Sequence, residues 1–243
     1  DNIRLSGDYV YDDTALRLYL PFEEGNGTKA YDRSNYGNHG NLSNRTTATC
    51  VTNAVGACPQ WAAGKFGQGL LFDGIGDFVN ITDTTIASLD VPFTVETWLK
   101  RTTGGVASDT QAFVHGSTNS WGFYAAFAGT GALGFGKIGV SEVLGSTGIL
   151  DTNWHHAVVT YDGTTARFYL DGNLDASPSY ADPGFVAGRM VIGISPTGSQ
   201  EFNGTLDDVA VWNKTLSPAE IRRHYLDGIQ RHGTVISDNF KIV

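Results

Sequence analysis

A segment near the start of the chain concentrates oxygen-bearing side chains. Asp32, Ser34, Asn35 and Asn38 lie within a few residues of one another, and Gly40 closes the segment. Hard cations such as Ca²⁺ take carboxylate, amide and main-chain oxygens from flexible loops. The segment therefore predicts a calcium site with Asp32, Asn35 and Asn38 among its ligands. The alternative is an ordinary turn whose polar side chains bond to its own backbone.

Several aromatic residues indicate a second kind of chemistry, the binding of sugars. Sugar sites need flat aromatic surfaces together with amide or acid groups at a groove. Trp98, His115, Trp121 and Tyr124 are candidates, because glycine-rich neighbours would leave such a surface open. The alternative is that these rings fill the core of the protein, as buried aromatic residues commonly do.

Signatures of catalysis are missing from the sequence. No Gly-x-Ser-x-Gly motif occurs, so a nucleophile elbow is not predicted. His155 and His156 are adjacent, and adjacent residues of a strand point to opposite faces, so the two cannot bind one metal ion together. We expect one structural histidine and one surface histidine.

The two cysteines, Cys50 and Cys58, are separated by a short polar loop. A metal site would need further thiols or a pair of histidines nearby. We therefore expect a disulfide, with two free thiols as the alternative. A disulfide favours a location outside the reducing cytoplasm.

Six Asn-x-Ser/Thr triplets indicate the same location. A turn-rich protein also produces such triplets by chance, which is the alternative. We expect a secreted protein, outside the cell or on its surface, with glycans at some of these sites. The asparagines are Asn26, Asn41, Asn44, Asn80, Asn203 and Asn213.

Composition limits the remaining classes of protein. The 243 residues carry a formal net charge of -9 and give a pI near 5.0, which argues against a nucleic-acid-binding surface. No run of about 18 apolar residues occurs, so we expect no insertion into a membrane. With 31 glycines, 12% aromatic residues and one methionine, the chain favours short strands and turns in a single domain.

A β-hairpin between Trp154 and Gly172 is the clearest local element. Two runs rich in Val, Thr, Tyr and Phe flank Asp162-Gly163, a dipeptide that suits tight hairpin turns. Residues 70–73 and 78–81 are expected to be strands on either side of a tight turn, and the polar run 23–44 is expected to be an irregular loop. Further strands are expected at 16–22, 93–100, 190–194 and 205–212.

One helix is predicted, from Pro218 to about Asp227. Ser217 can cap it and Glu220 completes a capping box, while Gly228 supplies a stop.

Blocks of sequence in a fixed order resemble laminin G-like domains of the concanavalin A-like superfamily. The Trp-His-His strand, the Asp-Gly turn and the Tyr-x-Asp-Gly ending within residues 154–172 are typical of these domains. Five further blocks extend the resemblance to roughly residues 16–226, and ordered blocks are more specific than any single motif. They are residues 16–27, 30–40, 64–81, 93–101 and 202–221.

This resemblance implies an all-β fold, a two-sheet antiparallel jelly-roll β-sandwich with one short C-terminal helix. Residues 1–15 would be a linker or an edge strand, residues 16–228 the laminin G-like domain, and residues 229–243 a tail that could add one strand.

The resemblance also implies that a calcium ion ties the Asp32 loop to an aspartate at the start of the last strand. The matching residue is Asp207, although Asp208 stays open as the ligand. If Val209 and Val211 face the core, strand alternation places Asp207 there too, where a carboxylate needs a cation or hydrogen-bond donors. A hydrogen-bonded acid without metal is the alternative.

Laminarinase-type glycoside hydrolases share the superfamily's fold and carry two glutamates on one strand. Glu96 stands alone in its predicted strand, so we expect no enzyme and assign Glu96 to hydrogen bonds with its neighbours. A glycosidase or lyase with an unusual active site is a minor alternative.

Together these observations predict an extracellular, calcium-stabilised, non-catalytic module that binds a glycan or a glycosylated surface protein. The alternative is a structural subunit of a surface layer or filament, in which residues 1–13 or 234–243 add a strand to another copy of the chain.

Overall fold

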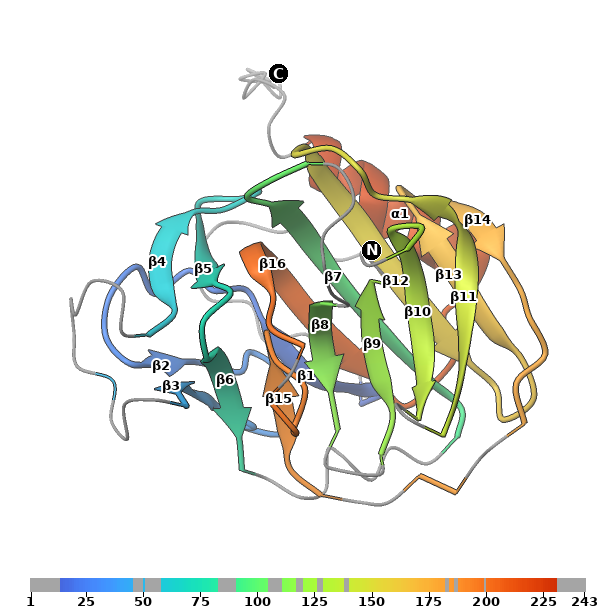
Figure 1. The fold of residues 1–243 in the computed structure, drawn as a ribbon, viewed down its shortest axis with the longest axis horizontal. Helices are drawn as coiled ribbons and strands as arrows, with labels where there is room; N and C mark the ends of the chain where they lie inside the picture. The colour runs from blue at the N-terminus through green and yellow to red at the C-terminus, as the bar shows by residue number, and fades with distance from the viewer. Residues whose placement is uncertain are drawn as a thin grey trace, which may run out of the picture.

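Two antiparallel β-sheets packed face to face form the body of the protein in the computed structural model (Figure 1). The predicted all-β sandwich with one C-terminal helix is confirmed. The structure describes residues 14–45, 50, 58–82, 91–104, 111–116, 120–125, 129–137, 140–181, 184–185, 188–198 and 200–230. The terminal segments 1–13 and 234–243, expected above to add a strand to a neighbouring copy, lie outside these residues.

Sheet A contains β1 (Leu16–Leu20), β4 (Gln60–Ala63), β5 (Gln68–Asp73), β7 (Phe93–Arg101), β12 (Trp154–Tyr161), β13 (Ala166–Leu170), β14 (Asn173–Ala176) and β16 (Asn203–Trp212). Its strand order is β14-β13-β12-β7-β16-β5-β4, and β1 also pairs with β16.

Sheet B contains β2 (Lys29–Ala30), β3 (Gly40–Asn44), β6 (Asp77–Ile81), β8 (Gln111–His115), β9 (Gly122–Ala125), β10 (Ala132–Lys137), β11 (Ser141–Gly148) and β15 (Met190–Ile192). Its strand order is β11-β10-β9-β8-β15-β6-β3-β2.

The predicted hairpin is confirmed. β12 and β13 pair in antiparallel register, with Tyr161 opposite Ala166 next to the turn. Asp162 Oδ1 accepts hydrogen bonds from the backbone N–H groups of Thr164 and Thr165 at 3.0 and 2.8 Å. This side chain therefore stabilises the turn as an Asx-type cap.

One local expectation needs correction. The run 23–44 is not an irregular loop throughout, because it contains β2 and β3. The buried positions of β3 are Gly40, Leu42 and Asn44. Because two of these three residues are not hydrophobic side chains, the sequence shows no hydrophobic alternation that would predict the strand. The predicted strands on either side of a tight turn after Asp73 are confirmed as β5 and β6, and the turn joins the two sheets, because β5 lies in sheet A and β6 in sheet B.

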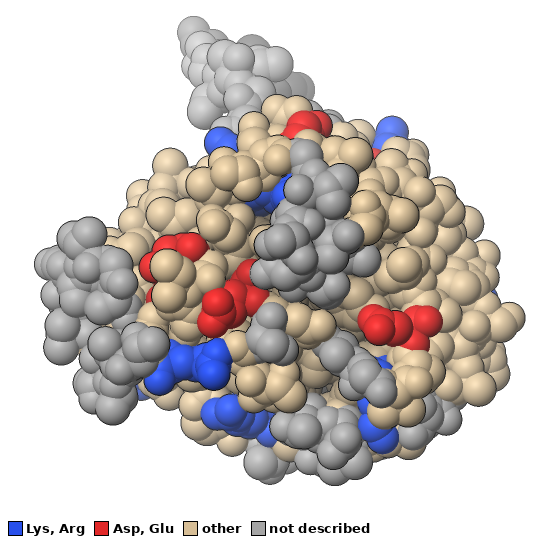
Figure 2. Space-filling view, in the orientation of Figure 1, with Lys and Arg blue, Asp and Glu red and all other residues tan. Residues whose placement is uncertain are grey.

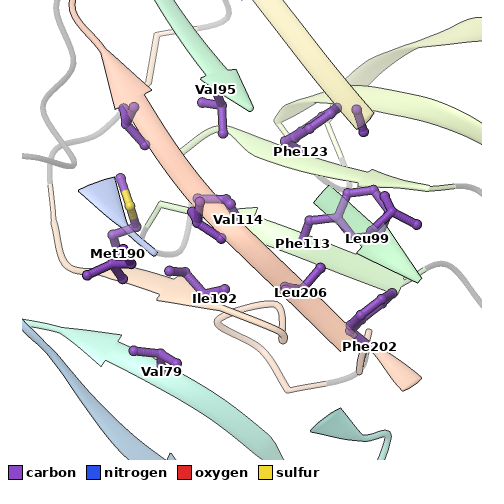
Figure 3. Packing of buried hydrophobic residues seen from close by; sticks show 14 of the residues in the cluster. Val79, Val95, Leu99, Phe113, Val114, Phe123, Met190, Ile192, Phe202 and Leu206 are labelled. Carbon is purple, nitrogen blue, oxygen red and sulfur yellow. The ribbon is translucent and has the colours of Figure 1, made fainter. Parts of the chain in front are cut away.

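The core between the sheets is rich in phenylalanine and branched aliphatic residues. Figure 3 shows side chains of β7 and β16 packed against those of β8, β9 and β15. Phe93, Val95 and Leu99 of β7 are fully buried here, as their alternation predicts. Burial of each such side chain contributes about 1.5–3 kcal/mol.

A second apolar cluster lies on the opposite, outer face of sheet A, where the helix α1 (Pro218–Gln230) covers the strands. Ile221 of α1 and Leu216 before it pack against residues of β1, β12, β13 and β16. The predicted capping box is present, since Ser217 N donates to Glu220 Oε2 at 2.7 Å and Glu220 N donates to Ser217 Oγ at 3.2 Å. The helix continues past Gly228, because a glycine weakens a helix without ending it.

Candidate functional site

An extra residue in β16 decides which way its acidic pair faces. Asp207 lies opposite Trp98 of β7, whereas Ala210 lies opposite Glu96, so three steps along β16 match two along β7. Asp208 takes up the difference with a φ of 47°. This is a β-bulge, which re-aims the side chains that precede it.

The bulge changes the face to which Asp207 belongs. Val209 and Val211 enter the core between the sheets, as expected. Asp207, as the partner of Trp98, lies instead on the outer face of sheet A. The expectation that Asp207 shares the core with these valines is therefore wrong, although the side chain is fully buried.

Asp207 is held by backbone donors on both carboxylate oxygens. Oδ2 accepts from Phe66 N at 2.9 Å and Oδ1 from Asp208 N at 2.8 Å. Burial, followed by the charges of Asp208 and Glu23, raises the pKa of Asp207 to about 9. A Cβ on Gly64 would lie 2.6 Å from Asp207 Oδ2, so the carboxylate fits only because residue 64 is a glycine.

The Asp32 loop forms a turn around its own carboxylate. Asp32 accepts hydrogen bonds from Tyr19 N, Ser34 N, Ser34 Oγ and Asn38 N at 2.7–2.9 Å. Asn38 Nδ2 donates to a main-chain carbonyl, and Asn35 is exposed. The hydrogen-bond donors of Asp32 differ from those of Asp207, so these bonds do not connect the two aspartates.

Among the described residues, no group of three or more His, Cys, Asp or Glu side chains is placed to hold a metal ion. Calcium also takes main-chain and amide oxygens, so the calcium site stays a prediction. Asp207 fits a cation better than Asp32 does, because it is buried beside other carboxylates and a cation would favour its ionised form.

A pocket opens on the outer face of sheet A, where α1 meets β1, β7 and β16. Four aromatic residues line it: Tyr19, Phe66, Trp98 and Trp212. Tyr225 of α1 stacks on Trp98 with ring centroids 5.7 Å apart.

A buried carboxylate lies at the base of this pocket between two histidines. Glu96 Oε1 and Oε2 are each 3.1 Å from His224 Nδ1, and Oε2 is 3.5 Å from His156 Nε2. Burial raises the pKa of Glu96, but the two histidines outweigh it and the pKa falls to about 2. Burial lowers the pKa of His224, but Glu96 outweighs it and the pKa rises. The assignment of Glu96 to hydrogen bonds with neighbours is confirmed.

The adjacent histidines have different surroundings. His156 is 1% exposed. His155 is partly exposed, and its ring nitrogens are bonded to Asp171 and Asp151 at 2.8 and 2.9 Å. His156 is thus the structural histidine and His155 the surface one, as expected.

The predicted sugar-binding residues are divided between the two sheets. Trp98 lies in β7 of sheet A, whereas His115, Trp121 and Tyr124 lie in or beside β8 and β9 of sheet B. Trp121 packs in the core against Phe93, with ring centroids 5.3 Å apart. Tyr124 and His115 are 1% and 3% exposed, and burial lowers the pKa of His115 to about 4. Only Trp98 of this set lines the pocket beneath α1.

Side-chain alternation along residues 93–100 predicts that Glu96 and Trp98 share one face of the strand. It does not predict that His224 and Tyr225 of α1 contact them. His224 is 128 residues from Glu96 in the chain, and the helix that carries it reads as an ordinary amphipathic segment. Only the capping box at Ser217 indicated that a helix was available to cover the sheet.

The predicted disulfide between Cys50 and Cys58 is confirmed. Of the six candidate glycosylation sites, Asn26 and Asn41 are exposed. Asn44 is buried, and its Nδ2 donates to Ile75 O and Asp77 Oδ1, so a glycan there would remove at least one of these bonds. Asn80, Asn203 and Asn213 are half-buried.

Charged residues are interspersed on the face seen in Figure 2. Lysine and arginine lie in separate small groups there, as do aspartate and glutamate. The helix of the described part is neither long nor apolar enough to cross a membrane.

The model of a laminin G-like family, described as the concanavalin A-like lectin/glucanases superfamily, matches residues 73–222. The match covers more than half of the chain, and the chain belongs to this family. The expected resemblance is therefore confirmed, although its blocks before residue 73 lie outside the match. No curated protein sequence matches the chain.

Solved structures share the fold at low sequence identity. Domain 4 of AbnA, an extracellular arabinanase from Geobacillus stearothermophilus solved in complex with arabinotriose, has 19% identity and a TM-score of 0.64, covering 86% of this chain and 97% of that domain. The binding domain of botulinum neurotoxin DC in complex with SialylT has 12% identity and a TM-score of 0.66, covering 88% of this chain and 52% of that one. Trypanosoma rangeli sialidase in complex with the inhibitor DANA has 15% identity and a TM-score of 0.59, covering 87% and 32%.

Proposed function

We propose that this chain is an extracellular carbohydrate-binding or adhesion module that is stabilised by calcium and performs no catalysis. The pocket beneath α1 carries the proposal, because aromatic rings and carboxylates meet there. Rings pack against the apolar faces of sugars, and carboxylates accept bonds from their hydroxyl groups. Structures that share the fold at low sequence identity, among them those solved with arabinotriose and with SialylT, also support carbohydrate binding.

The states of the two buried acids support a role without catalysis. A glycosidase needs a protonated carboxyl beside the bond that it breaks. Glu96 is held ionised by its histidines. Asp207 is the acid with the raised pKa, but it is fully buried and both its oxygens accept backbone bonds. Neither acid is placed to give a proton to a sugar.

Calcium is proposed at Asp207, where burial and neighbouring carboxylates disfavour ionisation and raise the pKa. The ion, when bound, would supply the positive charge that lets Asp207 ionise. Asp207 and its neighbour Glu23 would hold it, while Asp32, Asn35 and Asn38 remain the ligands proposed from the sequence.

An extracellular location is proposed because the chain has a disulfide and exposed sequons at Asn26 and Asn41. Mass spectrometry of the protein isolated from its source would detect glycans at these asparagines.

A glycan array probed with calcium and with a chelator tests the binding. We expect binding to a restricted set of glycans that weakens in the chelator. Binding that never exceeds background in either condition would remove the carbohydrate proposal. Turnover of any polysaccharide by the protein, lost in Glu96→Gln, would contradict the non-catalytic part.

A further inference from the structure

We propose that the pocket beneath α1 binds a primary ammonium group, so that its sugar ligand is an amino sugar with a free amine. The identity of the ligand as a sugar rests on the proposed function. The preference for an ammonium group rests on the charges, rings and hydrogen-bond acceptor of the pocket itself.

The charge of the pocket favours a cation. Glu96, Asp208 and Asp227 line it, and the described lining residues include no lysine or arginine. The only basic lining groups are His224 and His156, and both face Glu96. Asp208 accepts a bond from Tyr19, a neutral phenol, and Asp227 is exposed on α1. Three carboxylates and two histidines therefore line the pocket, and this excess of acidic groups would attract the positive charge of a ligand.

The walls of the pocket also favour a cation. An ammonium group is attracted to the faces of aromatic rings, most strongly to that of tryptophan. Trp98 already shows this attraction within the protein, because Lys65 Nζ lies 4.7 Å from the centroid of its ring, on which Tyr225 also stacks. Phe66 and Trp212 supply further rings around the pocket.

A buried acceptor distinguishes a primary ammonium group from related cations. His156 lines the pocket, is 1% exposed, and its Nδ1 has no hydrogen-bond partner. Because its Nε2 faces Glu96 at 3.5 Å, a proton on Nε2 leaves Nδ1 as an acceptor. A primary ammonium group has N–H donors for this atom. A trimethylammonium group has none, and an N-acetyl group carries no charge.

The test compares three probes by isothermal titration at a pH where amines are protonated. The probes are a glucosamine trisaccharide, its fully N-acetylated counterpart and methylamine. We expect the free-amine sugar to bind at least about tenfold more tightly than the acetylated sugar, as one charged hydrogen bond in a desolvated site would give. Equal binding of the two sugars would overturn the ammonium preference and leave the proposed function standing.

The remaining outcomes separate the two claims further. Binding of methylamine without binding of any sugar would support the ammonium site and overturn the amino-sugar ligand. Absence of binding by all three probes would overturn the inference, while the glycan array decides the proposed function independently.

Variants locate the binding in this pocket. Asp227→Asn and Asp208→Asn remove one charge each without a change of size, and asparagine tolerates the positive φ of residue 208. We expect each to weaken the amino sugar about tenfold and to leave the acetylated sugar unchanged. Glu201→Gln, an acid outside the pocket that pairs with Arg45, is the matched control. Equal effects of all three variants would overturn the assignment to this pocket.

Discussion

Asp207 shows how the backbone conformation of one residue can change the face of a sheet on which a neighbouring side chain lies. Alternation along β16 predicted an acid in the core, but the bulge at Asp208 turns it to the outer face beside Trp98. There the carboxylate is still fully buried and lies close to other acids, which is why its pKa rises. A bound cation would stabilise the ionised form of Asp207, which gives the calcium proposal a direct test.

Asp207→Asn should remove the response to calcium. Without calcium we expect a change within about 1 kcal/mol, because the amide is neutral like the protonated carboxyl but accepts only one of the two backbone bonds. With calcium at about 100 times its Kd, the parent should gain about 2.7 kcal/mol and the variant should gain none. Thermal unfolding with calcium and with a chelator measures both.

Asp32→Asn is the comparison for that experiment. If Asp32 only organises its turn, this variant loses stability equally with and without calcium, whereas a ligand role predicts loss of the calcium response as well. A parent protein whose unfolding temperature ignores calcium would contradict the site altogether.

The helix α1 is attached to sheet A by a buried ion pair as well as by apolar packing. His224 contacts Glu96 and stacks on Trp212 with ring centroids 5.6 Å apart. Ile221 adds an apolar contact. The docking of α1 should therefore depend on pH.

The direction follows from the two pKa values. The raised pKa of His224 contributes stability that is present below its ordinary value of 6.5 and is lost as the pH rises above it. The lowered pKa of Glu96 contributes stability that is present above 4.5 and is lost as the pH falls toward 2. We expect the contribution of this ion pair to the free energy of unfolding to be greatest between about pH 4.5 and pH 6.5.

His224→Gln should cost about 3 kcal/mol near pH 6, because Glu96 keeps a buried charge without its partner. Above pH 7 the difference from the parent should shrink. Chemical denaturation over this pH range measures the effect. His155→Gln is the control, since the pKa of His155 is also raised, by hydrogen bonds to Asp171 and Asp151 against the effect of burial. A pH profile unchanged by His224→Gln would contradict the ion-pair role.

The edge strand β11 is covered by an acid from the other sheet. Asp175 of β14 accepts from Ser146 N at 2.7 Å and from Thr147 N at 3.0 Å. These donors would otherwise be open to pairing with another chain. Asp175→Ala should therefore increase self-association, which sedimentation velocity at rising concentration would detect. Asp151→Ala, which removes an acid that bonds to His155 instead of to β11, should leave self-association unchanged. Identical profiles for Asp175→Ala and the parent would show that this edge does not need its acidic cover.

For the molecule as a whole, sheet A carries apolar clusters on both faces. The disulfide closes a short loop beside another pocket, separate from the one beneath α1. Cys50 and Cys58 line that pocket together with Trp61. Restricting a loop of eight residues in the unfolded chain is worth about 2.5 kcal/mol. Because most of the core lies elsewhere, the fold should survive loss of this bond.

Replacing both cysteines by alanine should therefore lower the unfolding temperature by about 5–10 °C without changing the far-UV circular dichroism spectrum. Calorimetry of the variant and of the reduced parent measures the change. A variant that fails to fold would show that the disulfide has more than a local effect.

The sequence by itself determined the elements whose causes are local. The Asp162-Gly163 turn, the alternation of Phe93, Val95 and Leu99, and the capping box at Ser217 act over a few residues, so they are visible in the chain. The cysteine pairing was equally accessible, because only one pairing was available.

Tertiary structure decided what depends on residues distant in the sequence. The bulge at Asp208 exists only in register with β7, and the crossing from β5 to β6 depends on which sheet each strand joins. His224 contacts Glu96 and Tyr225 stacks on Trp98 because α1 packs on sheet A. Side-chain alternation gives the face of a strand but not the partner that covers it, because that partner is fixed by the packing of the whole chain.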